Sequence, residues 1–171
     1  MENSESEILA ERLKELSCLY DIAKITLDSA KDFDQVLGEI VQRIPKAWKY
    51  ETAAICHIQV RTHWYKSAEE PHTHVFQEQI IRIGDQGNGR IRIYYPSPEF
   101  REHDFLEEEY RLLEKLALDL SLFIERQEIK SRELRYLESL RHHDRLKVLG
   151  EITGGIAHEL NTPLGSILGF S

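Results

Sequence analysis

The sequence predicts an α+β protein in which helices flank an antiparallel sheet and a long helix follows. Near both ends of the chain, apolar residues recur at steps of three and four, which is typical of helices. Between residues 52 and 95 they recur at every second position, which is typical of strands. A Gly-rich turn at residues 84–89 separates two of these strands and favours antiparallel connections.

Composition and charge limit the class of protein. Hydrophobic residues make up 41% of the 171 residues and charged residues 30%, as in ordinary globular chains. The net charge of −8, from 22 Lys+Arg and 30 Asp+Glu, predicts no nucleic-acid partner. The most apolar stretch, residues 116–124, is far shorter than the roughly 20 residues of a membrane span, so we expect no membrane insertion. Two cysteines, Cys18 and Cys56, and no signal peptide after Met1 favour the cytoplasm.

Residues 1–30 are predicted to form an N-terminal dimerisation helix. Ser4 and Glu7 have the spacing of a capping box at its start. Apolar residues then alternate steps of four and three, at Leu9, Leu13, Leu16, Tyr20, Ala23 and Leu27. A heptad stripe of this kind favours contact with a partner helix.

A second helix and four strands are predicted next. The helix runs from Phe33 to about Ile44, where Pro45 stops it. The predicted strands cover residues 52–60, 63–67, 75–83 and 90–95. In the first strand, alternation places Cys56 and His57 on opposite faces of the sheet.

A closing helix is predicted over residues 103–126, and it repeats the heptad spacing. Its stripe consists of Leu106, Tyr110, Leu113, Ala117, Leu120 and Ile124. Two interpretations are open for the stripes of the two helices: they cover the sheet within one chain, or they join two chains in a homodimer. We favour the homodimer.

Residues 127–145 are predicted to be a solvated helical linker, because charged residues are frequent and neither Gly nor Pro occurs. The apolar stripe that begins again at Leu149 is not in phase with Leu137, and such a break alters supercoiling locally. A signalling joint and a plain linker both fit this pattern.

Residues 146–171 are predicted to form the first helix of a functional domain, and they contain the strongest candidates for catalytic residues. At 100° per residue, one helix face contains the apolar side chains Leu149, Ile152, Ile156 and Leu160. His158 lies about 200° from Ile156 and should face water. Gly154 and Gly155 cost the helix roughly 1 kcal/mol each, but they leave room for a partner to approach His158.

These residues suit a nucleophilic histidine. An imidazole is mostly neutral at pH 7 and can attack an electrophilic phosphorus atom. Glu159 can accept the proton of the other ring nitrogen. Pro163 lacks an N–H, so we expect a bend one turn beyond His158. Alternatively, Pro163 simply ends a helix and His158 is one surface histidine among eight.

The run His158-Glu159-Leu160-Asn161-Thr162-Pro163-Leu164, with Leu149-Gly150-Glu151 upstream, resembles the H-box of the dimerisation and phosphoacceptor domain of sensor histidine kinases. The resemblance implies that ATP phosphorylates His158, with Glu159 as the assisting base and Asn161 in support. It also implies that Thr162, three positions after Glu159, positions water when the kinase dephosphorylates its response regulator.

The preceding region resembles a GAF sensor domain. The resemblance rests on Gly89-Arg90-Ile91-Arg92-Ile93-Tyr94-Tyr95 and on residues 105–126, which look like the last strand and closing helix of that family. It implies a GAF-like domain over residues 31–126. Ligand-binding members usually carry helices and loops where this chain has only the 84–89 turn, so we assign no ligand. A non-catalytic, dimeric GAF ligand-sensing module is the alternative function.

Other candidate sites have simpler explanations. Cys56-His57 resembles the dipeptide that holds a bilin in some photosensory GAF domains, but its two side chains point to opposite faces of a strand. His63, His72 and His74 lack any established metal-ligand spacing, and we expect solvated histidines and no metal.

We expect these 171 residues to be part of a longer kinase. They contain no Gly-rich phosphate loop and no ATP-binding fold after the H-box, and Ser171 ends an apolar run. By resemblance, an ATP-binding domain would follow. ATP and Mg²⁺ would act in that intact kinase and not bind this portion alone, and the receiver domain of a response regulator would be its partner.

Overall fold

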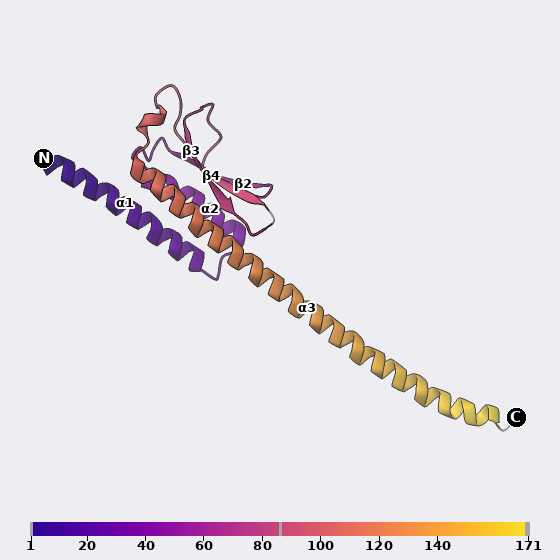
Figure 1. The fold of residues 1–171 in the computed structure, drawn as a ribbon. Helices are drawn as coiled ribbons and strands as arrows, with labels where there is room; N and C mark the ends of the chain where they lie inside the picture. The colour runs from indigo at the N-terminus through magenta and orange to yellow at the C-terminus, as the bar shows by residue number, and fades with distance from the viewer. Residues whose placement is uncertain (1, 86, 170–171) are drawn as a thin grey trace. The chain divides into compact units, whose positions relative to one another are not determined.

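The computed structural model describes the backbone of residues 2–85 and 87–169 and the side chains of residues 5–85 and 87–162. It confirms the α+β class: two N-terminal helices precede a four-stranded antiparallel sheet, and a long helix follows (Figure 1). The chain divides into two compact units, Met1–Gln127 and Glu128–Ser171.

The first unit opens with helices α1 (Glu2–Leu27) and α2 (Phe33–Arg43), followed by the 3₁₀ helix η1 (Ile44–Ala47). Asp32 caps α2, because its side chain accepts the Gln35 N–H at 2.8 Å while the Gln35 side chain accepts the Asp32 N–H at 3.0 Å. This reciprocal pair satisfies two donors that a helix start leaves open.

All four predicted strands are present, as β1 (Ile55–Val60), β2 (His63–Lys66), β3 (Phe76–Arg82) and β4 (Asn88–Tyr94). Their order in the sheet is β2-β1-β4-β3, and every neighbouring pair is antiparallel. Gly89 lets β4 approach β1, since a Cβ atom there would lie 2.3 Å from the Gln59 carbonyl oxygen.

The long helix α3 (Glu107–Gly169) begins four residues later than predicted. Residues Glu102–Asp104 form a separate 3₁₀ turn, η2. The Glu109 side chain accepts the Leu106 N–H at 2.8 Å, which fixes the helix start just after Leu106.

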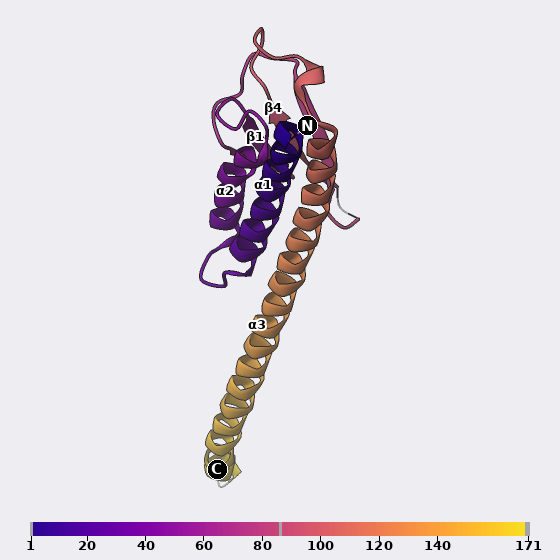
Figure 2. The same cartoon turned by 90° about the vertical axis from the view of Figure 1, so that its left-hand side faces the viewer.

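The core lies between the sheet and the helices, which share one side of it (Figure 2). Part of the α3 stripe belongs to this core: Leu113, Ala117, Leu120 and Ile124 are at most 5% exposed and cluster with Ile58, Ile91 and Ile93 of the sheet. The predicted dimer contact is therefore wrong for these α3 residues. They cover the sheet within one chain, because they are already buried in its core.

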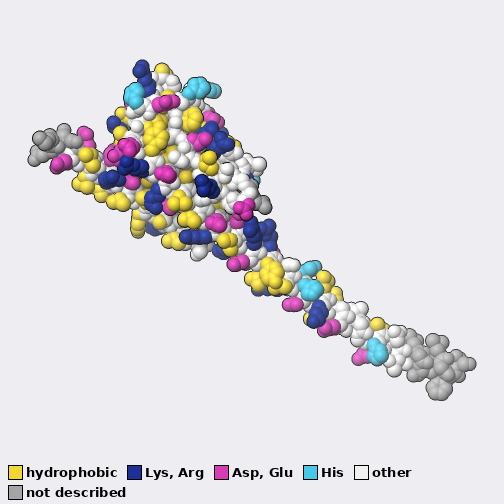
Figure 3. Space-filling view, in the orientation of Figure 1, with side chains coloured by type: hydrophobic (Ala, Val, Ile, Leu, Met, Phe, Trp, Pro, Cys, Tyr) yellow, Lys and Arg dark blue, Asp and Glu magenta, His cyan; other side chains and the backbone are white. Residues whose placement is uncertain are grey.

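The α1 stripe is different, because its large side chains are exposed by 58 to 76%: Leu9, Leu13, Leu16, Tyr20 and Leu27. Figure 3 shows hydrophobic side chains along this surface. The helix packs through its opposite face, where Cys18 and Ile22 are buried and Asp21 forms an ion pair with Arg43 of α2. At 100° per residue, Cys18 and the stripe centre are about 180° apart.

The second unit consists of the remainder of α3. Every described side chain from residue 129 to residue 162 is exposed in the single chain. Over the described residues, no helix combines the length and apolarity that a bilayer crossing requires.

Candidate functional site

The H-box-like segment is helical, as its sequence pattern predicts. Its apolar face remains exposed in the single chain, by 53 to 61% at Leu149, Ile152, Ile156 and Leu160. These side chains form one apolar face, which no other described part of the chain covers.

His158 is exposed, as expected, but so are all its described neighbours on this helix. Exposure alone therefore does not single it out. What distinguishes His158 is its face, because helical geometry separates it by about 200° from Ile156. A helix packed against the apolar face would leave the imidazole in water and accessible to a reacting partner.

Thr162 is joined to His158 through the backbone. Its hydroxyl donates to the His158 carbonyl oxygen over 3.0 Å, one helical turn back. A hydroxyl bond of this kind, to the carbonyl four residues back, ties the side chain to the helix. The structure thus places Thr162 on the His158 side of the helix.

Glu159 and Asn161 are also exposed. Helical geometry puts Glu159 about 100° and Asn161 about 60° from His158 around the axis. No hydrogen bond joins the Glu159 carboxylate to the His158 ring among the described contacts of this segment. Among the described contacts of these residues, the one that reaches His158 is the hydrogen bond from Thr162 to its backbone carbonyl.

Helix α3 continues through Pro163 to Gly169, so this proline does not end the helix. Pro163 has no N–H with which to bond the Glu159 carbonyl one turn back. The side chains of Pro163 and Leu164, which complete the H-box resemblance, lie outside the described side chains.

Cys56 and His57 lie on opposite faces of β1, as predicted. Cys56 is fully buried under the helices, and burial raises the pKa of its thiol well above the usual value. The His57 Nε2 atom lies 3.0 Å from the Ala68 carbonyl oxygen, and burial lowers the pKa of the ring. A protonated thiol and a histidine on the other face do not form one reactive site.

His63, His72 and His74 are exposed. The residues that the structure describes contain no group of three or more His, Cys, Asp or Glu side chains arranged to hold a metal ion.

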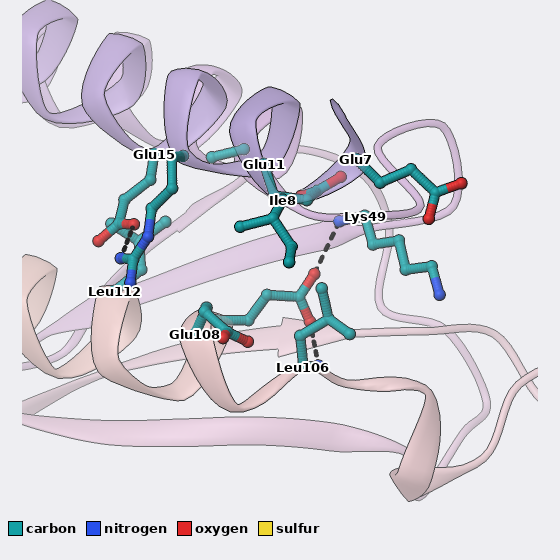
Figure 4. A pocket seen from close by; sticks show the side chains of 11 residues that line it. Glu7, Ile8, Glu11, Glu15, Lys49, Leu106, Glu108 and Leu112 are labelled. Atoms are coloured by element: carbon teal, nitrogen blue, oxygen red, sulfur yellow. Dashed lines mark hydrogen bonds and ion pairs between the residues drawn. The ribbon is translucent and has the colours of Figure 1, made fainter. Parts of the chain in front are cut away.

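A cavity of about 370 Å³ lies between α1 and the start of α3 (Figure 4). Five carboxylates contribute to its lining, with Arg12, Lys49 and apolar side chains between them: Glu7, Glu11, Glu15, Glu108 and Glu109. Arg12 already pairs with Glu15 at 2.9 Å, and Lys14 pairs with Glu11 at 3.3 Å.

Glu109 is the most informative residue of this cavity, and its role was not predicted from the sequence. It is only 3% exposed, and its two carboxylate oxygens accept the Lys49 N–H at 2.7 Å and the Leu106 N–H at 2.8 Å. Burial raises its pKa, although both N–H groups oppose that shift. Its place three residues after Leu106 was the available signal, because that spacing is typical of a helix start.

Comparisons of the chain with protein-family models, with curated proteins and with solved structures found no match. The class of protein that the structure defines is therefore an α+β protein with a long C-terminal helix. Any more particular function rests on the residues of the chain itself.

Proposed function

We propose that this chain is part of a sensor histidine kinase of a two-component system. A GAF-like domain over residues 31–126 would sense or relay a stimulus, and residues 146–171 would supply the first helix of the phosphoacceptor domain. The observation that carries the proposal is the ordered set His158, Glu159, Thr162 and Pro163 on a helix whose opposite face is apolar.

The resemblance to histidine kinases implies the reaction of the intact kinase. A ring nitrogen of His158 attacks the γ-phosphorus of Mg·ATP, the bond to the β-phosphate oxygen breaks, and ADP leaves. Glu159 accepts the proton on the other ring nitrogen as positive charge develops. The phosphoryl group then passes to an aspartate carboxylate of the receiver domain, and Glu159 returns the proton to the ring, which regenerates the neutral imidazole.

Thr162 suits the opposing reaction, in which water removes the phosphoryl group from the response regulator. Its hydroxyl donates to the His158 carbonyl at 3.0 Å, which holds its side chain on the His158 side of the helix. A phosphorylated aspartate docked against this side would bring the water that attacks it next to Thr162. Asn161 lies on the flank of this side and would support that docking.

Two exposed apolar faces support a homodimeric arrangement. One is the α1 stripe and the other is the face of α3 that contains Leu149, Ile156 and Leu160. A second copy would cover both without disturbing the core, because neither face contributes to it.

The alternative is a non-catalytic, dimeric GAF ligand-sensing module. One observation favours it: among the described contacts, no hydrogen bond joins the His158 ring to the Glu159 carboxylate. In such a module the α1 contacts would persist, but residue 158 would accept no phosphoryl group.

One experiment separates the two functions. The chain is incubated with a separately expressed histidine-kinase ATP-binding domain, Mg²⁺ and γ-labelled ATP, and label on the chain is followed over time. We expect the wild type and His142→Gln, a matched exposed histidine on α3, to become labelled and His158→Gln to lose all label. Label retained by His158→Gln would remove His158 from its role. An unlabelled wild type, when the same domain labels its own phosphoacceptor domain, would favour the sensing module.

A further inference from the structure

The face of the sheet that points away from the helices is exposed at Trp64, Arg90 and Ile80, whereas His57 and Tyr94 on the same face are buried. Strand pairing places one set of alternate residues on this outer face, while Cys56, Ile58, Ile91 and Ile93 face the core. We call this surface the outer face, and its residues include Trp64, Lys66, Phe76, Ile80, Arg90 and Arg92.

One row of the outer face crosses all four strands. Trp64 pairs with Gln59, Gln59 pairs with Arg90, and Arg90 pairs with Ile80. Trp64 is 43% exposed and Ile80 is 58% exposed, and the Arg90 side chain between them is 45% exposed. Three strand spacings separate the two apolar ends, which is roughly 14 Å.

The charge of the outer face is opposite to that of the chain. Lys66, Arg90 and Arg92 contribute three cations against two carboxylates: Glu70 lies 3.9 Å from Lys66, and Glu78 pairs with both arginines. Because one carboxylate serves two guanidinium groups, positive charge remains at the centre of the row. The chain as a whole has a net charge of −8. This local surplus favours an acidic occupant.

The surroundings of the aromatic rings on the outer face favour a protein over a nucleic acid as its binding partner. Lys66 lies over the Trp64 ring at 5.8 Å from its centroid, and Arg92 lies over the Phe76 ring at 5.0 Å. Nucleic-acid platforms stack bases on open ring faces, and here cations occupy a face of each ring. The acidic remainder of the chain also opposes a polyanion.

We propose that the outer face binds an acidic segment of a partner protein. The segment places one apolar side chain against Trp64, a carboxylate against Arg90 and a second apolar side chain against Ile80. Residues spaced four apart along an extended segment match the roughly 14 Å between the ends of the row. This proposal stands on the first unit alone and does not depend on the role of His158.

The test uses the whole 171-residue chain and a fluorescein-labelled peptide with two leucines four residues apart and a glutamate midway between them. Fluorescence anisotropy measures binding at 50 and at 300 mM salt. We expect saturable binding that weakens with salt, and at least tenfold weaker binding for Arg90→Glu and for Ile80→Ser. Arg126→Glu, the same charge change on exposed α3, should bind as the wild type does. Circular dichroism checks that each variant melts as the wild type does.

Three outcomes would overturn the proposal. The first is no binding of the glutamate peptide up to millimolar concentration. The second is equal binding when the peptide's glutamate is replaced by lysine, or equal weakening by Arg126→Glu, since either makes the contact non-specific. The third is tighter binding of a labelled single-stranded oligonucleotide that Arg90→Glu abolishes, because the outer face would then be a nucleic-acid platform.

Discussion

The α1 and α3 stripes are alike in sequence and opposite in environment. Both alternate steps of four and three along a helix. In α3, Leu113 and Leu120 are fully buried, whereas in α1, Leu13 and Leu16 are 58% and 62% exposed. Heptad spacing thus shows that a helix has an apolar face, and it does not show what covers that face.

The difference arises from the second face of each helix. α1 has a small inward face around Cys18 and Ile22, which packs on the body and leaves the larger stripe free. In α3 the stripe itself packs in the core from Leu113 to Ile124. A helix with two apolar faces can satisfy the core with one and keep the other for a partner.

The largest expected effect comes from truncating one leucine in each stripe. Leu113→Ala should lower the free energy of unfolding by about 2–5 kcal/mol, because it leaves a cavity in the core. Leu13→Ala should change it by no more than about 0.5 kcal/mol in the dilute, monomeric chain. Urea unfolding followed by circular dichroism measures both. Equal losses would mean that the two stripes are buried alike.

The next largest effect is expected from replacing the polar side chains that attach each helix to the rest of the first unit, Glu109 in α3 and Asp21 in α1. Glu109→Ala should cost about 1–3 kcal/mol, since the Lys49 and Leu106 N–H groups lose their acceptor in a buried place. Asp21→Ala removes a partly exposed ion pair with Arg43 and should cost up to about 1 kcal/mol. Thermal unfolding of the two variants checks the order. A larger loss for Asp21→Ala would contradict the assignment of Glu109 as the anchor of α3.

The smallest expected effect is a pH dependence of stability, which compares the buried His57 with the exposed His63. Burial lowers the pKa of His57, so the unfolded chain binds this proton at a higher pH than the folded chain does. The contribution of His57 is therefore complete above about pH 6.5 and is lost as the pH falls toward the folded pKa. His57→Gln should remove this part of the acid destabilisation, whereas His63→Gln, at an exposed position, should not. Parallel stability profiles for wild type and His57→Gln between pH 5 and 7.5 would contradict it.

Much of the fold could be predicted because its signals are local. Alternation in residues 52–60 gives β1, and the Gly-rich turn gives the β3–β4 hairpin. The order β2-β1-β4-β3 could not be predicted, because the pairing of β1 with β4 joins residues far apart in the sequence. The later start of α3 depends on Glu109, whose second partner, Lys49, lies 60 residues away.

The candidate site was predictable as a helix with His158 opposite an apolar face, since angular position follows from sequence alone. The hydrogen bond from Thr162 to the His158 carbonyl was not predicted, although residues four apart can form it. The roles of His158, Glu159, Asn161 and Thr162 stay predictions until phosphoryl transfer is measured.

We propose that the exposed α1 stripe, and not the buried residues of the α3 stripe, joins two copies of the chain. Sedimentation equilibrium at high micromolar concentration tests it most directly. We expect a mass near twice 20.0 kDa for the wild type and for Ile80→Glu, an exposed apolar residue of the sheet. The double variant Leu13→Glu/Leu16→Glu should dissociate at least ten times more readily. A monomeric wild type, or a double variant that associates as tightly as the wild type, would contradict the claim.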